Sequence, residues 1–368
     1  MKEYPVTLLL GPRQCGKTTL AMSVASERGA HRFDLEDPQV PLQPETAATV
    51  LRELRGLIVI DEIQRQPRLL ELLRVLADRR PLPARFLILG SASLDLVRGV
   101  SESLAGRVAY VQMGGFSLDE VTDRRRGELW VRGGFPGAFL PRDTERSFRW
   151  RVNFTQSILE RDLPQLGIRI PAAALRRFWT MLAHCHGGIW NAADLARSMS
   201  VKEDTARRYL DVLTGAFMVR QLPPWFENVG KRLVKAPKVY IRDSGILHCL
   251  LGLKDRTQVM SHPKLGLSWE GFVIEEIVRR LNADGEAYFY KTHGGAELDL
   301  LVLRAGRRYG FEVKFADAPA PTRSMREVSK DLRLDHLWVV HPGRHRIPLG
   351  QGMDAVPLGE LSRLLAEL

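Results

Sequence analysis

Cysteine is scarce in this chain, and its spacing argues against two classes of protein. The 368 residues contain three cysteines, Cys15, Cys185 and Cys249, and none of them forms a C-x-x-C pair. A disulfide framework needs more cysteines. A structural zinc site needs pairs of Cys or His ligands a few residues apart, such as C-x-x-C. His184 and His186 flank Cys185, but adjacent residues on a helix point to different faces, so we expect no metal there. This cysteine usage is typical of a reducing cytoplasm.

The chain also lacks any segment that would place it in a membrane. No apolar run approaches the length of about 18 residues that a transmembrane helix requires. Residues 2–5 lead directly into a strand-like segment and do not resemble a signal peptide. We find no internal repeat and no long low-complexity segment. We therefore expect a folded cytoplasmic protein with no membrane partner, and its length favours two or three domains.

Acidic residues are too few to balance the basic ones. Lysine and arginine total 54, aspartate and glutamate total 43, and the net charge is +11. An acidic partner would complement this charge, and DNA is the obvious candidate. The alternative is an arginine-rich proteome that places arginine on every surface, in which case the charge says nothing about partners.

The strongest motif lies near the N-terminus. The apolar run at residues 6–10 predicts a buried strand, and a helix-compatible segment begins after Gly16. Between strand and helix, Gly11, Gly16, Lys17 and Thr18 fill the fixed positions of the pattern G-x-x-x-x-G-K-[ST]. In this strand–loop–helix context the pattern predicts a P-loop.

Each part of the P-loop has a task in binding ATP. Successive N–H groups of the loop and the helix N-terminus point positive dipoles at a phosphate. Lys17 would reach the β- and γ-phosphates, and the Thr18 hydroxyl would be a Mg²⁺ ligand. The residues expected to bind the nucleotide are Gly11, Pro12, Arg13, Gln14, Cys15, Gly16, Lys17, Thr18 and Thr19.

A second apolar run, at residues 57–60, ends in the acidic pair Asp61 and Glu62. Ligands of open α/β sheets bind at the carboxyl ends of the strands, so both acids would face the nucleotide. We expect Asp61 to hold Mg²⁺, directly or through water, and Glu62 to act as general base on the attacking water. A third strand ends next to Ser91 and Ser93. Either serine would contact the γ-phosphate or the water, or would only cap the next helix.

Further motifs give the chain a family resemblance. Gly-Ser-Ala-Ser at residues 90–93 is followed by Ser-Glu-Ser-Leu-Ala-Gly-Arg at 101–107. Gly-Gly-Phe-Pro at 133–136, Leu-Glu-Arg-Asp at 159–162 and Tyr-Ile-Arg-Asp-Ser-Gly-Ile-Leu at 240–247 follow in order. Together with the two nucleotide motifs, this series resembles the AAA_14/DUF4143 family, the bacterial and archaeal AAA+ ATPases that carry a DUF4143 region. The resemblance covers most of the chain.

The resemblance implies ATP and Mg²⁺ as cofactors and an AAA+ core over residues 1–115, followed by a helical lid over residues 116–170. It also implies that Arg107 is a candidate arginine finger, a catalytic residue that acts on the nucleotide of a neighbouring subunit. A homo-oligomer is then the expected assembly. The alternative for Arg107 is a surface or structural arginine.

Residues 171–230 predict a winged-helix segment. Asn191 would cap one short helix, and residues 200–203 match a capping box that would start a second helix. An apolar stretch at residues 217–222 then predicts a strand. A helix–turn–helix followed by a strand is typical of a winged helix.

The second of these helices carries basic side chains that would meet DNA. Lys202, Arg207 and Arg208 would contact phosphates or base edges. A winged helix that binds another protein is the alternative. Residues 231–260 follow as a connector, whose basic start at residues 231–238 would be a solvated link or a phosphate contact.

The last third of the chain predicts a second catalytic site. Residues 269–278 predict an amphipathic helix that contains Glu270, and the strands after it carry Asp299, Glu312 and Lys314. Asp299 and Glu312 would lie on two strands of a hairpin, with Lys314 on the same strand face as Glu312. This D…E-x-K pattern resembles the PD-(D/E)xK fold of restriction endonucleases.

In that fold, carboxylates on adjacent strands share a Mg²⁺ ion, and the lysine orients water or stabilises developing charge. The resemblance implies Glu270, Asp299 and Glu312 as metal ligands in a nuclease-like domain over residues 261–368. Asp299, Glu312 and Lys314 would be its catalytic residues. Two alternatives stay open: an inactive fold kept for DNA binding or assembly, and exposed acids that simply pair with a lysine.

The expected fold class is therefore α/β: a P-loop AAA+ core with a helical lid, a winged-helix segment and a C-terminal restriction-endonuclease-like α/β domain. The expected function is ATP binding and hydrolysis by a protein that acts on DNA, with DNA cleavage as an open question. The alternative is a nucleotide-dependent switch, or a DNA-binding regulator, whose nuclease-like fold is inactive.

Overall fold

The computed structural model describes residues 3–40, 42–43, 46–91, 94–226 and 233–368, with the backbone alone for residues 94–98. These residues form two compact units: Met1–Gly115 with Gly215–Phe217, and Phe116–Thr214 with Met218–Leu368. Ser93 and residues 231–232 of the predicted connector lie outside the described residues. No helix in the described ranges is long and apolar enough to span a membrane.

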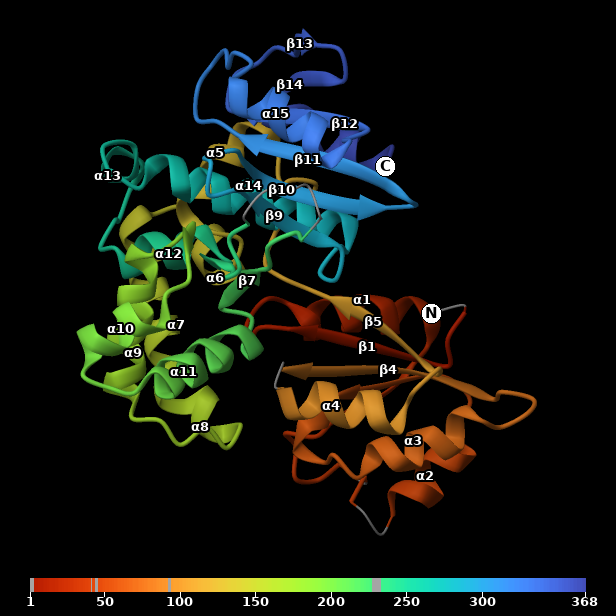
Figure 1. Ribbon diagram of the computed structural model, residues 1–368. Coiled ribbons are helices and arrows are strands. Elements are labelled where there is room, and N and C mark those ends of the chain that lie inside the picture. Colours follow the sequence, from red (N-terminus) through yellow and green to blue (C-terminus); the bar gives the residue numbers. More distant parts are fainter. Residues whose placement is uncertain (1–2, 41, 44–45, 92–93, 227–232) are drawn as a thin grey trace. The chain divides into compact units, whose positions relative to one another are not determined.

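The first unit is built around a five-stranded sheet in the order β2-β3-β4-β1-β5, in which every neighbouring pair is parallel. In Figure 1, α1 covers one face of this sheet, and α2, α3 and α4 lie on the other. Its elements are β1 (Val6–Gly11), α1 (Lys17–Arg28), β2 (His31–Asp34), α2 (Ala47–Glu53), β3 (Gly56–Asp61), η1 (Ile63–Arg65), α3 (Leu69–Ala77), β4 (Ala84–Ser91), α4 (Leu94–Ser103) and β5 (Val108–Gln112).

Alternate residues of these strands build two cores. Leu8 and Ile58 pack with the side chains of α2 and α3, whereas Leu9 and Val59 pack with those of α1. Because both faces are covered, the strands are continuous apolar runs in the sequence. Parallel pairing also brings the carboxyl ends of β1, β3 and β4 to one edge, where the nucleotide motifs lie.

The second unit contains a small sheet and the helices around it. Its first elements are η2 (Asp123–Arg125), α5 (Arg126–Arg132), α6 (Pro136–Phe139), α7 (Thr144–Ser157), η3 (Ile158–Asp162), α8 (Leu163–Gln165), α9 (Ala172–His184), β6 (Gly188–Ile189), α10 (Ala192–Met199), α11 (Glu203–Gly215), β7 (Val219–Leu222), β8 (Lys238–Ile241), α12 (Ser244–Leu250) and α13 (Arg256–Met260). The three strands are antiparallel, in the order β6-β8-β7.

The cap of one helix in this region was predicted correctly and that of the next was not. The side chain of Asn191 accepts hydrogen bonds from the backbone N–H groups of Ala193 and Asp194, as expected at the start of α10. The capping box at residues 200–203 is wrong. Ser200 has a φ of 57°, a left-handed conformation that ends α10, and α11 begins only at Glu203.

The remainder of the second unit is a six-stranded mixed sheet in the order β13-β14-β12-β11-β10-β9. α14 and α16 pack on one face of this sheet, and α15 packs on the other. The elements are α14 (Leu265–Leu281), β9 (Ala287–Lys291), β10 (Glu297–Arg304), β11 (Arg307–Val313), α15 (Arg323–Leu332), β12 (His336–His341), β13 (Ile347–Gly350), β14 (Met353–Pro357) and α16 (Leu358–Ala366). A parallel sheet of P-loop type and a separate C-terminal sheet confirm the α/β class.

Candidate functional site

The glycine-rich loop connects β1 to α1 in a conformation that its glycines permit. A Cβ atom at Gly11 would lie 2.2 Å from the backbone oxygen of Met113, and Gly16 has a φ of 106°. The ammonium of Lys17 donates hydrogen bonds to the backbone oxygens of Gly11 and Pro12, at 3.0 and 2.8 Å. The lysine is therefore buried at the centre of its own loop.

The other predicted loop residues surround this lysine in different ways. The thiol of Cys15 is buried and lies 3.9 Å from the backbone oxygen of Met113. Arg13 lies 3.9 Å from Glu36, while Gln14 has a φ of 60° and Thr19 is exposed. The loop is thus held by packing at Cys15 and is open to solvent at Gln14 and Thr19.

Thr18 and Asp61 come together although they lie 43 positions apart in the sequence. The Thr18 hydroxyl donates a hydrogen bond of 2.8 Å to the carboxylate of Asp61, which ends β3. A hydroxyl and a carboxylate are oxygen ligands of the kind that Mg²⁺ prefers, so this pair fits the metal of an ATP site.

Glu62 follows Asp61 at the same sheet edge. Its backbone N–H donates to the Asp61 carboxylate at 2.9 Å, and its φ is 55°. Burial raises the pKa of its carboxyl group, although Gln64, which donates a hydrogen bond to it, and the charges of Arg13 and Lys17 act in the opposite direction. A carboxylate with a raised pKa beside the phosphate loop has the properties of a general base.

Ser91 also belongs to this edge. It ends β4, pairs in register with Gly11 and is 3% exposed. Its hydroxyl has no hydrogen-bond partner among the described residues. Ser91 is therefore buried at this edge, in line with the carboxyl ends of β1 and β3.

Arg107 lies apart from the nucleotide motifs of its own chain. It immediately precedes β5, and its backbone oxygen accepts a hydrogen bond from Val6, at the start of β1. This is the sheet edge opposite to the P-loop. The guanidinium pairs with both carboxylate oxygens of Asp78, at 2.7 and 2.9 Å.

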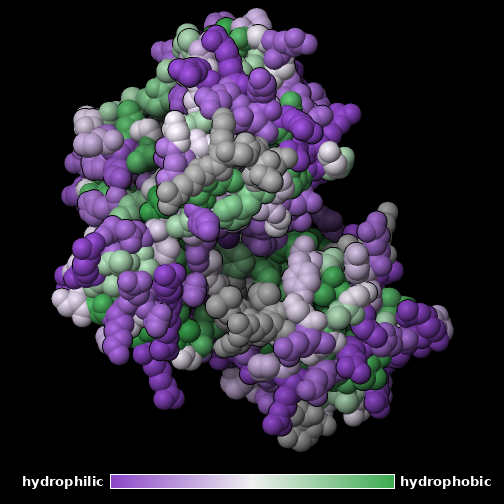
Figure 2. Space-filling view, viewed as in Figure 1, coloured by the Kyte–Doolittle hydropathy of each residue, from purple (hydrophilic) through white to green (hydrophobic). Residues whose placement is uncertain are grey.

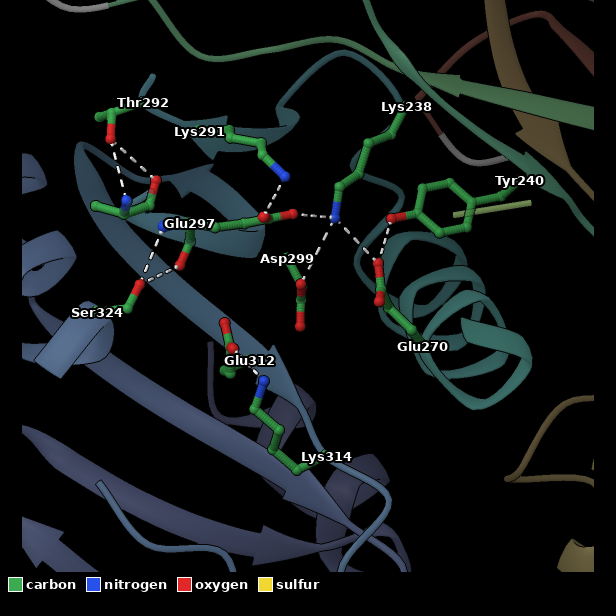
Figure 3. Close-up of polar contacts among 11 residues, drawn as sticks. Lys238, Tyr240, Glu270, Lys291, Thr292, Glu297, Asp299, Glu312, Lys314 and Ser324 are labelled. Atoms are coloured by element: carbon green, nitrogen blue, oxygen red, sulfur yellow. Dashed lines mark hydrogen bonds and ion pairs between the residues drawn. The ribbon is translucent and has the colours of Figure 1, made fainter. Parts of the chain in front are cut away.

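The C-terminal site residues converge as the sequence predicted. Asp299 on β10, Glu312 on β11 and Glu270 on α14 are 6%, 7% and 8% exposed, and their carboxylates gather at the same place (Figure 3). The ammonium of Lys314 lies 2.6 Å from Glu312. The backbone N–H of Val313 donates to Asp299 at 2.9 Å. Glu297 joins them, and we call Glu270, Glu297, Asp299 and Glu312 the carboxylate cluster.

A lysine from outside the C-terminal sheet enters this cluster. The ammonium of Lys238, on β8, lies 2.9 Å from Glu297, 3.2 Å from Glu270 and 3.6 Å from Asp299 (Figure 3). Lys238 is 3% exposed, so its prediction as a solvated link or phosphate contact is wrong. Tyr240, two residues further along the same strand face, donates a 2.6 Å hydrogen bond to Glu270.

Burial and neighbouring charge set the protonation of the cluster. Burial raises the pKa of Glu270 and of Glu312, and the charge of Asp299 raises both further. Burial alone would lower the pKa of Lys238, but Glu270, Asp299 and Glu297 raise it above its usual value. Lys238 is therefore an ammonium ion that compensates buried carboxylates.

The metal-ligand set predicted for this site stays a prediction. Within the described ranges, no group of three or more His, Cys, Asp and Glu side chains is arranged to hold a metal ion. Lys238 lies 3.2 Å from Glu270 and 3.6 Å from Asp299, while Lys314 pairs with Glu312. The predicted residues are brought together, but around ammonium groups.

Comparison with known proteins agrees with the P-loop geometry. The AAA domain family AAA_14 matches residues 3–122. Two domains of unknown function, DUF8612 and DUF4143, match residues 124–257 and 265–361. The chain belongs to the AAA_14/DUF4143 family of P-loop ATPases.

Two mycobacterial relatives are similar to this family member over nearly its whole length. They are uncharacterized protein Rv2008c of Mycobacterium tuberculosis and uncharacterized protein Mb2031c of Mycobacterium bovis. Each is 52% identical over 361 residues, which cover 98% of this chain and 82% of the relative. Among solved structures, the Walker-type ATPase PABY2304 of Pyrococcus abyssi is 16% identical with a TM-score of 0.49, over 68% of this chain and 92% of that chain.

A buried ion network in this AAA_14/DUF4143 ATPase escaped the sequence analysis. Glu275 on α14 lies 2.7 Å from Arg220 on β7 and 2.7 Å from Arg242, which follows β8. Arg220 also contacts Asp284 at 2.7 Å. Lys238, Tyr240 and Arg242 alternate along the chain, so one face of β8 meets α14 through charged and polar groups.

The second unit of this ATPase also contains a basic cavity of about 630 Å³. Its walls include Trp269 and Phe315, which are the sequence neighbours of Glu270 and Lys314. No ion pair is found for Arg124, Arg256 or Arg344 among the residues that the structure describes. The arginine and aromatic side chains that line the cavity are Arg124, Arg126, Trp130, Arg256, Trp269, Phe315 and Arg344.

Proposed function

We propose that this protein hydrolyses ATP with Mg²⁺ at the P-loop of its first unit. The observation that carries the proposal is the 2.8 Å contact of Thr18 with Asp61 beside the buried ammonium of Lys17. When bound, Mg²⁺ would be held by this pair and would neutralise phosphate charge. Lys17 would exchange its contacts with backbone oxygens for contacts with phosphate oxygens.

Two further residues would act on the attacking water. Glu62 would orient it and accept its proton, because burial keeps this carboxyl group basic. The Ser91 hydroxyl, which is buried without a partner in the described ranges, would hydrogen-bond either the water or the γ-phosphate. Both residues stand at the strand ends where β3 and β4 meet the P-loop edge.

We further propose that the second unit binds DNA through the basic cavity beside the carboxylate cluster. Arginines that lack a carboxylate partner are suited to phosphate, and aromatic side chains give bases a surface for stacking. Arg124, Arg256 and Arg344 supply the first property, and Trp130, Trp269 and Phe315 the second.

The helices before the C-terminal sheet support the same proposal. The order α9-β6-α10-α11-β7-β8 and the antiparallel sheet β6-β8-β7 agree with the winged-helix prediction. Lys202, Arg207 and Arg208 are exposed at α11, the helix proposed to meet DNA. This surface would supply a second set of phosphate contacts.

A second candidate function is a nucleotide-dependent switch or DNA-binding regulator whose nuclease-like fold is inactive. The position of Lys238 favours it, because cleavage by this kind of site depends on a metal ion between the carboxylates. ATP hydrolysis would then change the conformation or assembly of the protein without cutting DNA.

The test is DNA binding by the purified protein, measured by fluorescence anisotropy with single-stranded, duplex and branched DNA. The variant carries Arg256→Gln and Arg344→Gln, and the control carries Arg326→Gln, an exposed arginine on α15. We expect the double variant to lose about tenfold or more in affinity and to reduce the salt slope by about two. The control should bind like the wild type.

Equal binding and equal salt slopes for the double variant and the wild type would contradict the proposed DNA site. Incubation of the same DNAs with Mg²⁺ then separates the two candidate functions. Mg²⁺-dependent cleavage that is lost in Asp299→Asn supports a nuclease, and binding without cleavage supports the regulator.

A further inference from the structure

We infer that Lys238 is the resident cation of the carboxylate cluster and that its ammonium group excludes a divalent metal ion from the site. The cluster lies where a metal-dependent nuclease of this fold would bind its ion. The inference concerns metal binding alone, so it does not depend on whether the protein binds DNA or hydrolyses ATP.

The distances place the Lys238 ammonium where a metal ion shared by Glu270 and Asp299 would lie. Lys238 lies between Glu270 of α14 and the β10 residues Glu297 and Asp299, at 3.2, 2.9 and 3.6 Å. A Mg²⁺ ion bound by Glu270 and Asp299 would need carboxylate oxygens at about 2.1 Å from one point. One oxygen of Glu270 and one oxygen of Asp299 face the ammonium (Figure 3), and the second Asp299 oxygen accepts a hydrogen bond from the backbone N–H of Val313.

The backbone holds Lys238 in this position from both sides. Lys238 begins β8, the central strand of its sheet, and pairs in register with Ile189 on β6 and Leu222 on β7. Tyr240 on the same strand face donates to Glu270 and so holds the partner carboxylate as well. The side chain is 4% exposed, so its charge is not free to move into solvent without a rearrangement of the site.

The charges within the site are also largely compensated without a metal ion. Besides Lys238, Lys291 contacts Glu297 at 2.6 Å and Lys314 contacts Glu312 at 2.6 Å. Three ammonium groups thus accompany the four carboxyl groups of the carboxylate cluster. A divalent ion would add charge where compensation is nearly complete, and it would have to displace a buried ammonium that has three carboxylate neighbours.

The test measures Mn²⁺ binding by isothermal titration calorimetry on the full chain without nucleotide. All proteins carry Asp61→Asn, so that the P-loop site contributes no metal binding. We expect no Mn²⁺ site in this parent that depends on the cluster. We expect Lys238→Met, which keeps an unbranched side chain but removes its charge, to gain one Mn²⁺ site with an affinity about tenfold or more above any binding by the parent.

Three matched variants identify the gained site. Lys238→Arg, which keeps the charge, should behave like the parent. Lys291→Met removes an ammonium that contacts Glu297 at the edge of the cluster, and it should gain no comparable site. Asp299→Asn added to Lys238→Met should remove the gained Mn²⁺ site, because it removes a ligand.

Two results would overturn the inference. The first is a parent that binds one Mn²⁺ ion which Asp299→Asn abolishes, a result that needs no change at Lys238. The second is a folded Lys238→Met protein, with tryptophan fluorescence like that of the parent, that gains no Mn²⁺ site. If Lys238→Met does not fold, Lys238→Gln takes its place, since its amide can still donate to the cluster.

Discussion

At the scale of single residues, Lys17 shows how the P-loop is built before a phosphate arrives. Lys17 is 6% exposed, and its ammonium donates hydrogen bonds to the backbone oxygens of Gly11 and Pro12. These oxygens are weaker partners than phosphate oxygens, so the charge is held in place and available for exchange. Glu62 is the complementary case, a carboxyl group whose pKa burial raises at the end of β3.

Removal of these two side chains should have different consequences. We expect Lys17→Ala to abolish ATP hydrolysis and weaken nucleotide binding, because the phosphates lose their cation. Glu62→Gln should keep nucleotide binding and reduce hydrolysis by about 100-fold or more, because the general base is lost. Steady-state ATPase rates and binding of a fluorescent ATP analogue measure the two effects.

Arg65→Gln serves as the control, since Arg65 contacts Glu36 at 2.8 Å on the surface of the same unit. It should leave both nucleotide binding and hydrolysis unchanged. Normal turnover by Lys17→Ala would contradict the P-loop assignment. Normal turnover by Glu62→Gln would contradict only the role given to Glu62.

The residues of the P-loop were predictable from the sequence because the motif fixes their spacing within one short loop, between β1 and α1. Lys238 was not, because Glu270 lies 32 positions further on. The period of two along β8 places Lys238 and Tyr240 on one face, but it does not say which helix covers that face. For Asp299 and Glu312 the hairpin supplied this information, since both strands were visible in the sequence.

At the scale of elements, the buried ion network connects α14 to the small sheet, because Glu275 of α14 pairs with Arg220 and Arg242. Burial alone would raise the pKa of Glu275, but Arg220 and Arg242 lower it to about 2. We expect Glu275→Gln to destabilise the second unit by about 3–5 kcal/mol, because two arginines lose the charge that compensates their burial.

This loss of stability can be measured in the second unit by itself, because all seven tryptophans lie in that unit. Urea unfolding followed by tryptophan fluorescence gives its free energy of unfolding. Glu203→Gln is the control: Glu203 and Arg207 form an exposed pair at 3.8 Å on α11, worth about 0–1 kcal/mol. Equal losses of unfolding free energy in the two variants would mean that the buried Glu275 network contributes no more to stability than an exposed ion pair.

A second buried polar chain lies between α5, α12 and α14. The indole N–H of Trp130 donates to the Ser268 hydroxyl at 3.1 Å. This hydroxyl lies 2.7 Å from Nε2 of His248. Nδ1 of His248 lies 2.9 Å from the backbone oxygen of Val131. A backbone oxygen only accepts, so Nδ1 donates and Nε2 accepts from Ser268. The imidazole is neutral, and burial lowers the pKa of His248 to about 4.

This shift makes part of the stability depend on pH. Between about pH 4 and 6.5 the unfolded histidine binds a proton that the folded one does not, so stability falls as the pH decreases. The lowered pKa of His248 should therefore reduce the free energy of unfolding by about 3 kcal/mol between pH 7 and pH 4. His248→Gln should lose less stability than the wild type over this range in urea unfolding. Parallel pH profiles for the two proteins would show that folding does not lower the pKa of His248.

The helices and strands themselves were largely predictable, because their periodicity is local. The failures lie where two elements meet. The pattern at residues 200–203 matches a capping box, yet only three residues separate α10 from α11. In so short a connection the same serine can end one helix or start the next, and Ser200 ends α10 in a left-handed conformation.

At the scale of the whole molecule, the two units divide the chemistry of the chain. The P-loop residues lie in the first unit, and the carboxylate cluster, the basic cavity and every tryptophan lie in the second. Hydrophilic side chains cover most of the visible surface of each unit (Figure 2). The net charge of +11 predicted an acidic partner, but only the folded chain gathers Arg124, Arg256 and Arg344 around one cavity.

The position of Arg107 carries a prediction about assembly. It lies at the sheet edge opposite to its own P-loop, so in the proposed role it serves the nucleotide of a neighbouring subunit. Arg107→Ala should then reduce ATP hydrolysis by about 100-fold or more while its own nucleotide binding stays intact. The control Asp78→Asn removes the partner of Arg107 and keeps the arginine, so it separates a finger from a structural ion pair.

Mixing two inactive proteins tests this prediction directly. An Arg107→Ala subunit has an intact P-loop, and a Lys17→Ala subunit has an intact arginine. Random mixing in equal amounts should restore about a quarter of the wild-type rate, since half of the subunits have the P-loop and half of those have a neighbour with the arginine. Mixed oligomers, shown by native mass spectrometry, that remain inactive at every ratio would contradict the finger. Equal loss of activity in Asp78→Asn and Arg107→Ala would assign Arg107 to a structural pair.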